Sequence, residues 1–253
     1  MAELTLHERR RRQVYGRRKG PKLSQHQTSL FETLLPRLEL QLRHGCDPRS
    51  YFSPKGVDDV WLEIGFGGGE HLLWQARQHP NVGFIGAEPY EGGVAKLLSK
   101  LALPGTAAIL AASGDGEPSL RAGSSRSQED NIRIYRGDGR DVVEALPDAS
   151  LGRVFILFPD PWPKARHHKR RIIQMSSLDA LARVMRPRAA LRLASDDAGY
   201  VAWMLEHILA HPAFEWIAVC ADDWKSRPAD WPPTRYEEKA LHGPPSFLSF
   251  LRL

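Results

Sequence analysis

An apolar run that ends in a proline-rich loop is the feature that most constrains the fold of this chain. Residues 154–158 are all apolar, which predicts a strand buried within a sheet. Prolines occupy three of the next five positions. Because proline fixes φ and restricts the residue before it, they exclude a helix here and predict a stiff, extended loop. Asp160 and Trp162 lie in this loop, and a basic run at 164–171 follows it.

The position of this loop at a strand end points to a kind of substrate. In an open α/β sheet, ligands bind beyond the carboxyl ends of the strands. An acid, an aromatic ring and concentrated positive charge at such an end predict chemistry on a flat, polar, anionic substrate. A base within a nucleic acid has all three properties.

Strand and helix signals alternate through most of the chain. The predicted strands are 60–64, 82–87, 131–135, 154–158, 189–194, 214–219 and 247–251. One predicted helix follows the first strand and ends at Gln78, and three others span 92–101, 172–185 and 200–209. Residues 24–44 also have helical spacing, and we expect Pro36 to bend or end that helix. Alternation with short crossovers predicts an α/β, Rossmann-like fold, in which helices cover both faces of a mostly parallel, twisted, seven-stranded sheet.

The positive charge of the chain is concentrated at its start. The net charge is +5, but the first 22 residues alone hold eight basic and two acidic residues. We therefore interpret residues 1–23 as a basic, flexible arm attracted to phosphate backbones, with a merely solubilising arm as the alternative. Residues 24–253 then form one domain. Its stretch 104–130, rich in Gly, Ser, Ala and Pro, is predicted to be an inserted surface loop.

Composition argues against several other classes of protein. The only cysteines, Cys46 and Cys220, provide neither a disulfide framework nor zinc-ligand spacing, so we expect no structural metal. No apolar run is long enough to span a membrane, and no apolar segment of a secretory signal follows the basic start. We expect a cytoplasmic protein with no membrane partner.

A glycine-rich turn after the first predicted strand indicates a nucleotide-type cofactor. Glu63–Gly69 fits the pattern E-x-G-x-G-x-G, typical of Rossmann-like S-adenosylmethionine methyltransferases. The dinucleotide fingerprint G-x-G-x-x-G fails, because Glu70 and Leu72 stand where its last glycine is required. Gly65, Gly67 and Gly69 allow a tight turn and close approach of backbone to ligand. A carboxylate at position 63 suits the cationic methionine portion better than a diphosphate.

Two further acids follow predicted strands. Glu88 ends the second strand, about 20 residues beyond the glycine turn, where an acid typically binds ribose hydroxyls. Asp138 lies just after the third strand, where a carboxylate can accept a hydrogen bond from an adenine amino group. Each of these acids has an ordinary alternative as a solvated loop residue or helix cap.

The proline-rich loop also has ordinary alternatives. Asp160 fits a simple turn residue, and Trp162 fits a core anchor as well as a ring that stacks on a base. The run 166–171 fits a solvated helix start, and its histidines lack a carboxylate or cysteine to complete a metal site.

Three segments together closely resemble the bacterial tRNA (guanine-N7)-methyltransferase family. They are Glu63–Gly67, the block from Phe158 to Arg171, and Thr234–Glu237. The resemblance implies a class I methyltransferase domain that uses S-adenosylmethionine to methylate a guanine of the tRNA variable loop.

The resemblance also implies roles for individual residues. Cofactor binding is expected of Glu63, Gly65, Gly67, Gly69, Glu88, Asp138 and Asp160, and Asp160 is also the expected catalytic residue. Substrate binding is expected of Lys164, Asp196, Thr234, Arg235, Tyr236 and Glu237. RNA contact is expected of Arg166, His167, His168, Lys169, Arg170 and Arg171.

The predicted chemistry needs positioning more than proton transfer. Guanine N7 has an available lone pair, and methylation leaves the purine cationic, so a nearby carboxylate stabilises the developing charge. Asp160 is the first choice for this role, with Asp196 and Glu237 as further candidates. Two other functions compete, a nicotinamide-dependent oxidoreductase and a non-catalytic RNA-binding protein. The glycine spacing disfavours the first, and the ordered acids disfavour the second.

Overall fold

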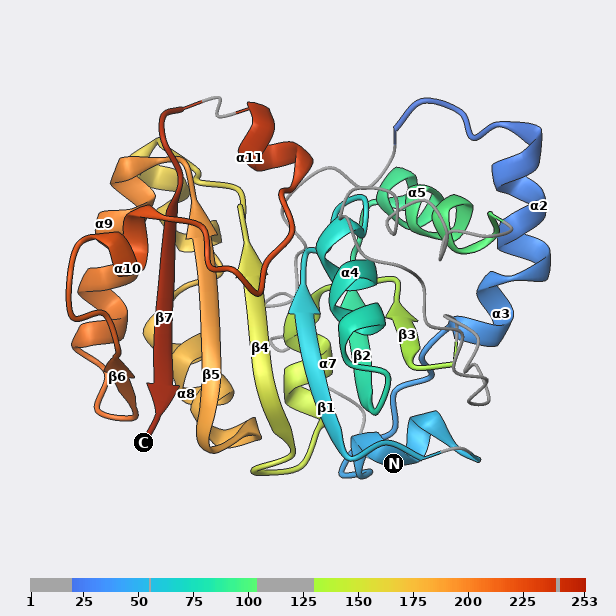
Figure 1. The fold of residues 1–253 in the computed structure, drawn as a ribbon, viewed down its shortest axis with the longest axis horizontal. Helices are drawn as coiled ribbons and strands as arrows, with labels where there is room; N and C mark the ends of the chain where they lie inside the picture. The colour runs from blue at the N-terminus through green and yellow to red at the C-terminus, as the bar shows by residue number, and fades with distance from the viewer. Residues whose placement is uncertain (1–19, 55, 104–129, 240–241) are drawn as a thin grey trace, which may run out of the picture.

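The computed structural model describes residues 20–54, 56–103, 130–239 and 242–253. The predicted insertion and most of the predicted arm lie outside these residues. Within them the chain forms a seven-stranded sheet in the order β3-β2-β1-β4-β5-β7-β6 (Figure 1). The strands are β1 (Asp59–Ile64), β2 (Val82–Ala87), β3 (Ile132–Tyr135), β4 (Leu151–Leu157), β5 (Met185–Ser195), β6 (Phe214–Trp216) and β7 (Ser246–Arg252).

Strands β1 to β5 pair in parallel, whereas β7 runs antiparallel between β5 and β6. This arrangement confirms the predicted mostly parallel α/β sheet. β7 pairs with β5 over residues 246–251 and with β6 only over residues 250–252, which leaves the short β6 at the edge of the sheet.

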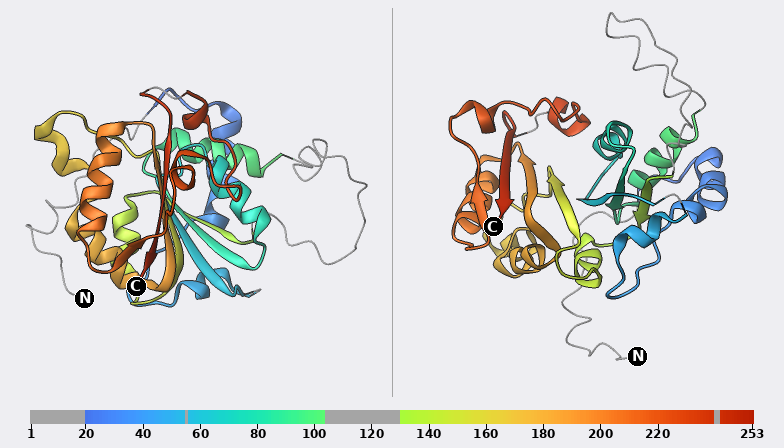
Figure 2. Two further views of the ribbon diagram at one scale, coloured as in Figure 1. Left: turned by 60° about the vertical axis from the view of Figure 1, so that its left-hand side comes forward. Right: turned by 60° about the horizontal axis from the view of Figure 1, so that its bottom comes forward.

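Helices cover both faces of this sheet (Figures 1 and 2). The first face packs against α2 (Gln25–Thr33), α3 (Leu35–Leu38), α4 (Glu70–Gln78) and α5 (Glu91–Leu101). The second face packs against α7 (Gly139–Ala145), α8 (Met175–Val184) and α9 (Ala198–Leu209). The shorter elements are η1 (Pro48–Phe52), η3 (Ala165–Arg170), α10 (Asp222–Lys225) and α11 (Arg235–Lys239).

Alternation along β1 decides which side chains meet each layer of helices. Leu62 and Ile64 belong to the core on the second face, whereas Trp61 belongs to the core on the first. Because side chains alternate along a strand, Glu63 points to the same face as Trp61, toward α4.

The order of the strands creates a crevice between two loops. From β1 the chain winds outward through β2 and β3, then returns to β4 on the other side of β1 and continues to β5. The loops that follow β1 and β4 therefore diverge, which is where open α/β sheets bind ligands. The glycine-rich and proline-rich loops lie on two sides of this crevice.

Some elements differ from the sequence prediction. β6 ends at Trp216 rather than at residue 219. Ile217 keeps one backbone hydrogen bond to Ser249 of β7, whereas Val219 is 96% exposed beyond the strand. The short helices α7, α10 and α11 were not predicted, since few turns give little periodicity. Pro36 stands at the start of α3, so the predicted interruption of the first helix is confirmed.

Candidate active site

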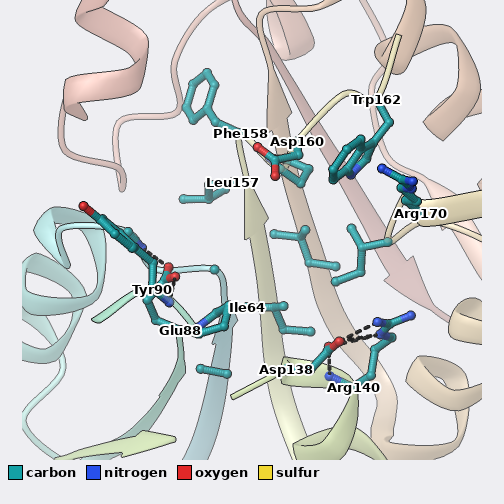
Figure 3. A pocket seen from close by; sticks show the side chains of 18 residues that line it. Ile64, Glu88, Tyr90, Asp138, Arg140, Leu157, Phe158, Asp160, Trp162 and Arg170 are labelled. Atoms are coloured by element: carbon teal, nitrogen blue, oxygen red, sulfur yellow. Dashed lines mark hydrogen bonds and ion pairs between the residues drawn. The ribbon is translucent and has the colours of Figure 1, made fainter. Parts of the chain in front are cut away.

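A cavity of about 350 Å³ opens at the carboxyl ends of β1, β2 and β4 (Figure 3). This volume lies within the range of small-molecule sites. Part of its lining is apolar, from Ile64, Ile156 and Leu157. Glu88, Asp138 and Asp160 also line it, and each comes from a loop after a different strand (Figure 3). The structure therefore brings three of the predicted acids together around one cavity.

The glycine-rich loop has a backbone that only glycine adopts readily. Gly65, Gly67 and Gly69 have φ values of 77°, 56° and 73°, in the left-handed region. A Cβ added at Gly93 of α5 would lie 2.4 Å from the Gly67 carbonyl oxygen, so the helix can approach the loop only at a glycine. Gly65 and Gly67 line the cavity, whereas Gly69 caps α4 and packs near Leu97.

Glu88 fixes this loop from the end of β2. Its Oε2 accepts a hydrogen bond from the backbone N–H of Gly67, and its Oε1 accepts one from that of Tyr90, each at 2.8 Å. Burial raises the pKa of the Glu88 carboxyl, an effect increased by the negative charges of Asp160 and Glu63 and opposed by the two N–H donors. A cationic ligand in the cavity would relieve this penalty.

Asp138 lines the cavity and also caps α7. Its Oδ1 accepts a hydrogen bond from the backbone N–H of Arg140 at 3.0 Å, and its Oδ2 forms an ion pair with the Arg140 guanidinium at 2.5 Å. Asp138 therefore caps the helix and lines the cavity at the same time, so the two interpretations do not exclude each other. Arg140 also lines the cavity, so Asp138 meets a ligand with its charge partly compensated.

The proline-rich loop is bounded by two residues in a conformation that is rare outside glycine. Phe158 and Trp162 have φ values of 49° and 46°. Such backbone costs about 1 to 3 kcal/mol per residue and persists where the surroundings enforce it, often at functional sites. Here the prolines on both sides of Asp160 remove much of the freedom to relax.

Asp160 sits at the mouth of the cavity between Phe158 and Trp162 (Figure 3). None of the described residues donates a hydrogen bond to its carboxylate. The side chain is exposed, yet protein atoms around the mouth displace part of its hydration and raise the pKa of its carboxyl.

Trp162 lines the same mouth and is not a core anchor. Its ring is half-buried, with the Arg170 guanidinium 4.9 Å from the ring centroid and the His167 ring edge-on at 5.8 Å. Arg170 also lines the cavity, beside Trp162 (Figure 3). The loop thus places an aromatic ring and a cation next to the open carboxylate.

Comparison with known proteins connects this geometry to a family. A family described as "Putative methyltransferase" matches residues 58–245. A tRNA (guanine-N(7)-)-methyltransferase of Rhodospirillum rubrum is 48% identical over 94% of this chain and 87% of its own length. Proteins of the same name from Paramagnetospirillum magneticum and Brucella anthropi are 44% and 43% identical over 92% and 94% of this chain, and over 89% and 94% of their own lengths.

The chain belongs to the tRNA (guanine-N7)-methyltransferase family. The resemblance found in the three sequence segments is confirmed. Family membership decides against the oxidoreductase and against a non-catalytic RNA-binding protein.

The cofactor of this family is S-adenosylmethionine, and the cavity fits it. Buried, destabilised negative charge at Glu88 suits a cationic ligand, and the apolar lining suits a purine ring. Glu88 and Asp138 would hold the adenosine portion, and Gly65 and Gly67 would let the backbone approach the ligand. These two acids are the predicted cofactor residues with the clearest supporting geometry.

Glu63 does not line this cavity, in contrast to its neighbour Ile64. Its side chain is 4% exposed, and its Oε2 lies 2.7 Å from Nδ1 of His71 in α4. This placement follows from the alternation of β1, which turns Glu63 away from Ile64.

The predicted RNA-contacting run divides into outward and inward side chains. Residues 165–170 form η3, in which no residue is buried, and Lys164 before it is exposed. Arg171 is only 5% exposed, and its Nε donates a hydrogen bond to the Pro161 carbonyl at 2.8 Å. Its guanidinium also lies 4.8 Å from the Trp203 ring centroid. Arg171 thus braces the proline-rich loop from behind, unlike the exposed part of the run.

The C-terminal motif lies at the start of α11. Thr234 is buried and accepts a hydrogen bond from the backbone N–H of Glu237 through its hydroxyl, at 3.3 Å. Glu237 pairs with Arg227 at 3.5 Å, and Arg235 is exposed. Asp196, after β5, accepts a hydrogen bond from the backbone N–H of His242 at 3.2 Å. None of these residues lines the cavity, so they would meet a substrate only beyond its rim.

Sequence reasoning missed two residues of the site. Tyr90 lines the cavity and donates its backbone N–H to Glu88, and Arg140 pairs with Asp138. The signal for Arg140 was available, because Asp138 followed three residues later by Asp141 is typical of a helix start. No sequence pattern identifies Tyr90, because its place in the lining depends on how the chain folds after β2.

The described residues contain neither a metal-binding cluster nor a membrane-spanning helix. No group of three or more His, Cys, Asp or Glu in these ranges is placed to hold a metal ion. None of the helices seen there has the length and apolarity needed to cross a membrane.

Proposed function

We propose that this chain transfers a methyl group from S-adenosylmethionine to N7 of a guanine in the variable loop of tRNA. Asp160 is its proposed catalytic residue. The observation that carries the proposal is the open carboxylate of Asp160 at the mouth of an acid-lined cavity, next to the ring of Trp162. The names of the curated relatives supply the substrate and the target atom.

The residues support a mechanism based on positioning and charge. When bound, S-adenosylmethionine supplies a methyl group activated by a sulfonium. Guanine N7 has a free lone pair, so no residue needs to act as a strong base. Asp160 stabilises the positive charge that develops on the purine and accepts hydrogen bonds from its N1–H and 2-amino groups. Trp162 offers a face on which a base stacks, an interaction worth about 1 to 3 kcal/mol in single-strand binders.

Exposed positive charge beside the mouth supports a nucleic-acid substrate. Lys164, Arg166 and Lys169 are exposed on or just before η3. The basic arm joins the described fold at Gly20, where an added Cβ would overlap the ring of Tyr90, a residue of the cavity lining. Phosphate contacts from these two sources would fix the orientation of tRNA without reading its sequence. With tRNA as the proposed substrate, we also propose a cytoplasmic location.

Residues farther from the cavity complete the proposal. Lys164, Asp196 and Thr234–Glu237 are proposed to contact the substrate beyond the rim, where α11 and the loop after β5 lie. Glu63 and Gly69 are proposed to support the cofactor through the shape of the glycine-rich loop rather than from the lining.

One experiment tests reaction, substrate and target atom together. The full-length protein is incubated with methyl-labelled S-adenosylmethionine and unmodified tRNA, and the digested nucleosides are analysed. We expect 7-methylguanosine at the variable loop. A matched tRNA that carries 7-deazaguanosine at the target position lacks only the N7 lone pair, so it should accept no label. Label at another atom, or undiminished transfer to the 7-deaza substrate, would contradict the proposal.

A further inference from the structure

Three buried polar side chains lie on the face of β1 that Trp61 also occupies, outside the lining of the cavity. They are Glu63, His71 and Gln75, with exposed fractions of 4%, 2% and 0%. Glu63 Oε2 lies 2.7 Å from His71 Nδ1, and His71 Nε2 lies 3.2 Å from Gln75 Nε2. Gln75 Nε2 in turn donates to the backbone carbonyl of Asp230 at 2.7 Å, across 155 positions of sequence. We call these three side chains the Glu63–Gln75 network.

The Asp230 carbonyl sets the direction of every hydrogen bond in this network. A carbonyl only accepts, so the Gln75 amide must turn its NH₂ group toward it. The second hydrogen of that NH₂ group then points to His71 Nε2, which must accept. His71 therefore carries its hydrogen on Nδ1 and donates it to the Glu63 carboxylate.

The arrangement has a cost that packing alone would avoid. Gln75 Oε1 is buried without a hydrogen-bond partner among the described residues, and a buried unsatisfied oxygen is destabilising. The surroundings are aromatic, since the His71 ring contacts Phe155 and Trp231 at centroid distances of 4.6 and 5.6 Å. Apolar side chains would fill this space equally well. What the polar side chains add is a directional chain of hydrogen bonds that ends on the Asp230 carbonyl.

The network anchors the start of the C-terminal segment, residues 228–239. The carboxylate of Asp230 adds a second anchor, with its Oδ2 3.3 Å from Arg153 and 3.6 Å from Arg192. Trp231 is 5% exposed and packs edge-on against Phe247 at 5.5 Å. The candidate substrate residues Thr234–Glu237 follow within a few positions, so a shift of Asp230 would move them.

We propose that His71 and Gln75 are positioning residues, which set the placement of the C-terminal segment relative to the glycine-rich loop. Glu63 lies next to the last residue of β1, just before that loop, and Asp230 lies near the start of the segment, so the network links the two sides of the active site. This role rests on the proposed function for the substrate contacts of residues 234–237. It gives Glu63 a partner within the network, through His71.

The test uses Gln75→Met, which keeps the volume of the side chain and removes its donors. A peptide that covers residues 228–239 should exchange its backbone hydrogens about tenfold faster, because one anchor of the segment is lost. The KM for tRNA should rise about tenfold, while kcat and the Kd for S-adenosylmethionine stay within about twofold. Gln75→Asn is the second variant, with an amide too short to reach the Asp230 carbonyl.

Asn131→Leu is the matched control. Asn131 is a buried amide that donates to the carbonyls of Ala76, His79 and Val82 at the C-terminal end of α4, and these hydrogen bonds do not involve the C-terminal segment. Each variant is measured at the same number of degrees below its own Tm. Under these conditions Asn131→Leu should leave unchanged both the hydrogen exchange of residues 228–239 and the KM for tRNA.

The two readouts separate the possible failures. Unchanged exchange in Gln75→Met and Gln75→Asn, or equal effects in Asn131→Leu, would overturn the proposal. Faster exchange with an unchanged KM for tRNA would overturn it too, because the segment would then not be positioned for substrate. If the wild-type protein failed to methylate tRNA, the proposed function would fall, and the exchange comparison would still decide whether the network anchors the segment.

Discussion

The glycine-rich and proline-rich loops border the same cavity but hold their shapes in different ways. The glycine-rich loop is flexible by composition and takes its shape from a partner, because Glu88 accepts the backbone N–H of Gly67. The proline-rich loop is stiff by composition, and Arg171 braces it from behind through the Pro161 carbonyl.

In the proline-rich loop, the residue that faces the cavity differs from the residue that supports the loop. In the glycine-rich loop, one residue does both. Glu88 both braces its loop and lines the cavity, so a single carboxylate has two tasks. In the proline-rich loop, Asp160 lines the cavity and Arg171 does not, so the proposed catalytic role and the support of the loop belong to different residues. Substitutions should therefore have mixed effects on the first loop and separable effects on the second.

The largest expected effect comes from Asp160→Asn. Loss of the carboxylate should reduce kcat by about 100-fold, comparable to the loss of one preorganised group that stabilises a transition state. Exchange of backbone hydrogens in residues 158–163 should stay unchanged, because Asp160 does not brace its loop. Turnover within a few-fold of wild type in a single-turnover assay would remove Asp160 from the catalytic role.

Glu88→Gln should affect binding and loop order together. The variant should bind S-adenosylmethionine roughly 10- to 100-fold more weakly, since hydrogen bonds to a charged group contribute about 1.5 to 3 kcal/mol. Backbone hydrogens of residues 65–69 should exchange faster in the same variant. The exposed Glu91→Gln, at the start of α5, is the control for charge alone. Weaker binding by calorimetry without faster exchange would show that Glu88 does not brace the loop.

Arg171→Lys should disturb the proline-rich loop while it keeps the charge of the basic run. A lysine lacks the planar guanidinium that bonds Pro161 and packs on Trp203, so kcat should fall roughly fivefold. The salt dependence of tRNA binding should remain that of wild type. Its control, Lys169→Met, removes an exposed charge and should lower the slope of log affinity against log salt by about 0.7 to 0.9, with kcat unchanged. The reverse pattern would make Arg171 an RNA contact.

The smallest expected effect is on the pH dependence of stability. Burial raises the pKa of the Asp160 carboxyl, so ionisation of this group opposes folding once the pH exceeds its pKa in the unfolded chain, about 3.9. Asp160→Asn should thus raise the free energy of unfolding at pH 7.5, by less than about 1 kcal/mol because solvent screens the group. The gain should vanish below about pH 3, where both states of the wild type are protonated. Denaturant titrations at the two pH values measure this difference, and a gain that grows toward acid would contradict it.

Local sequence determined the strand ends and the chemistry they carry. Apolar runs and proline or glycine punctuation depend on backbone preferences of neighbouring residues, so they predicted β1, β2 and β4 and the loops that follow them. The same logic placed Glu88, Asp138 and Asp160 at strand ends, where a parallel sheet brings them together. The glycine spacing could be read from the sequence because each of Gly65, Gly67 and Gly69 stands where the backbone has a positive φ.

Only the tertiary structure decided which way several of these side chains face. The alternation along β1 groups Glu63 with Trp61, but the partner that Glu63 meets, His71, depends on the packing of α4 against that face. Arg171 has the same local pattern as its exposed neighbours, and it turns inward because Tyr200 and Trp203 of α9 provide a surface for its guanidinium.

The hydrogen bond between Gln75 and Asp230 is the contact that local sequence patterns could least predict. Their sequence separation of 155 residues means that no periodicity or motif relates them. The pairing forms because β4 and β5 bring Arg153 and Arg192 to the same face of the sheet as α4. Sequence by itself thus determined the elements and their chemistry, while packing between distant elements determined which polar groups became partners.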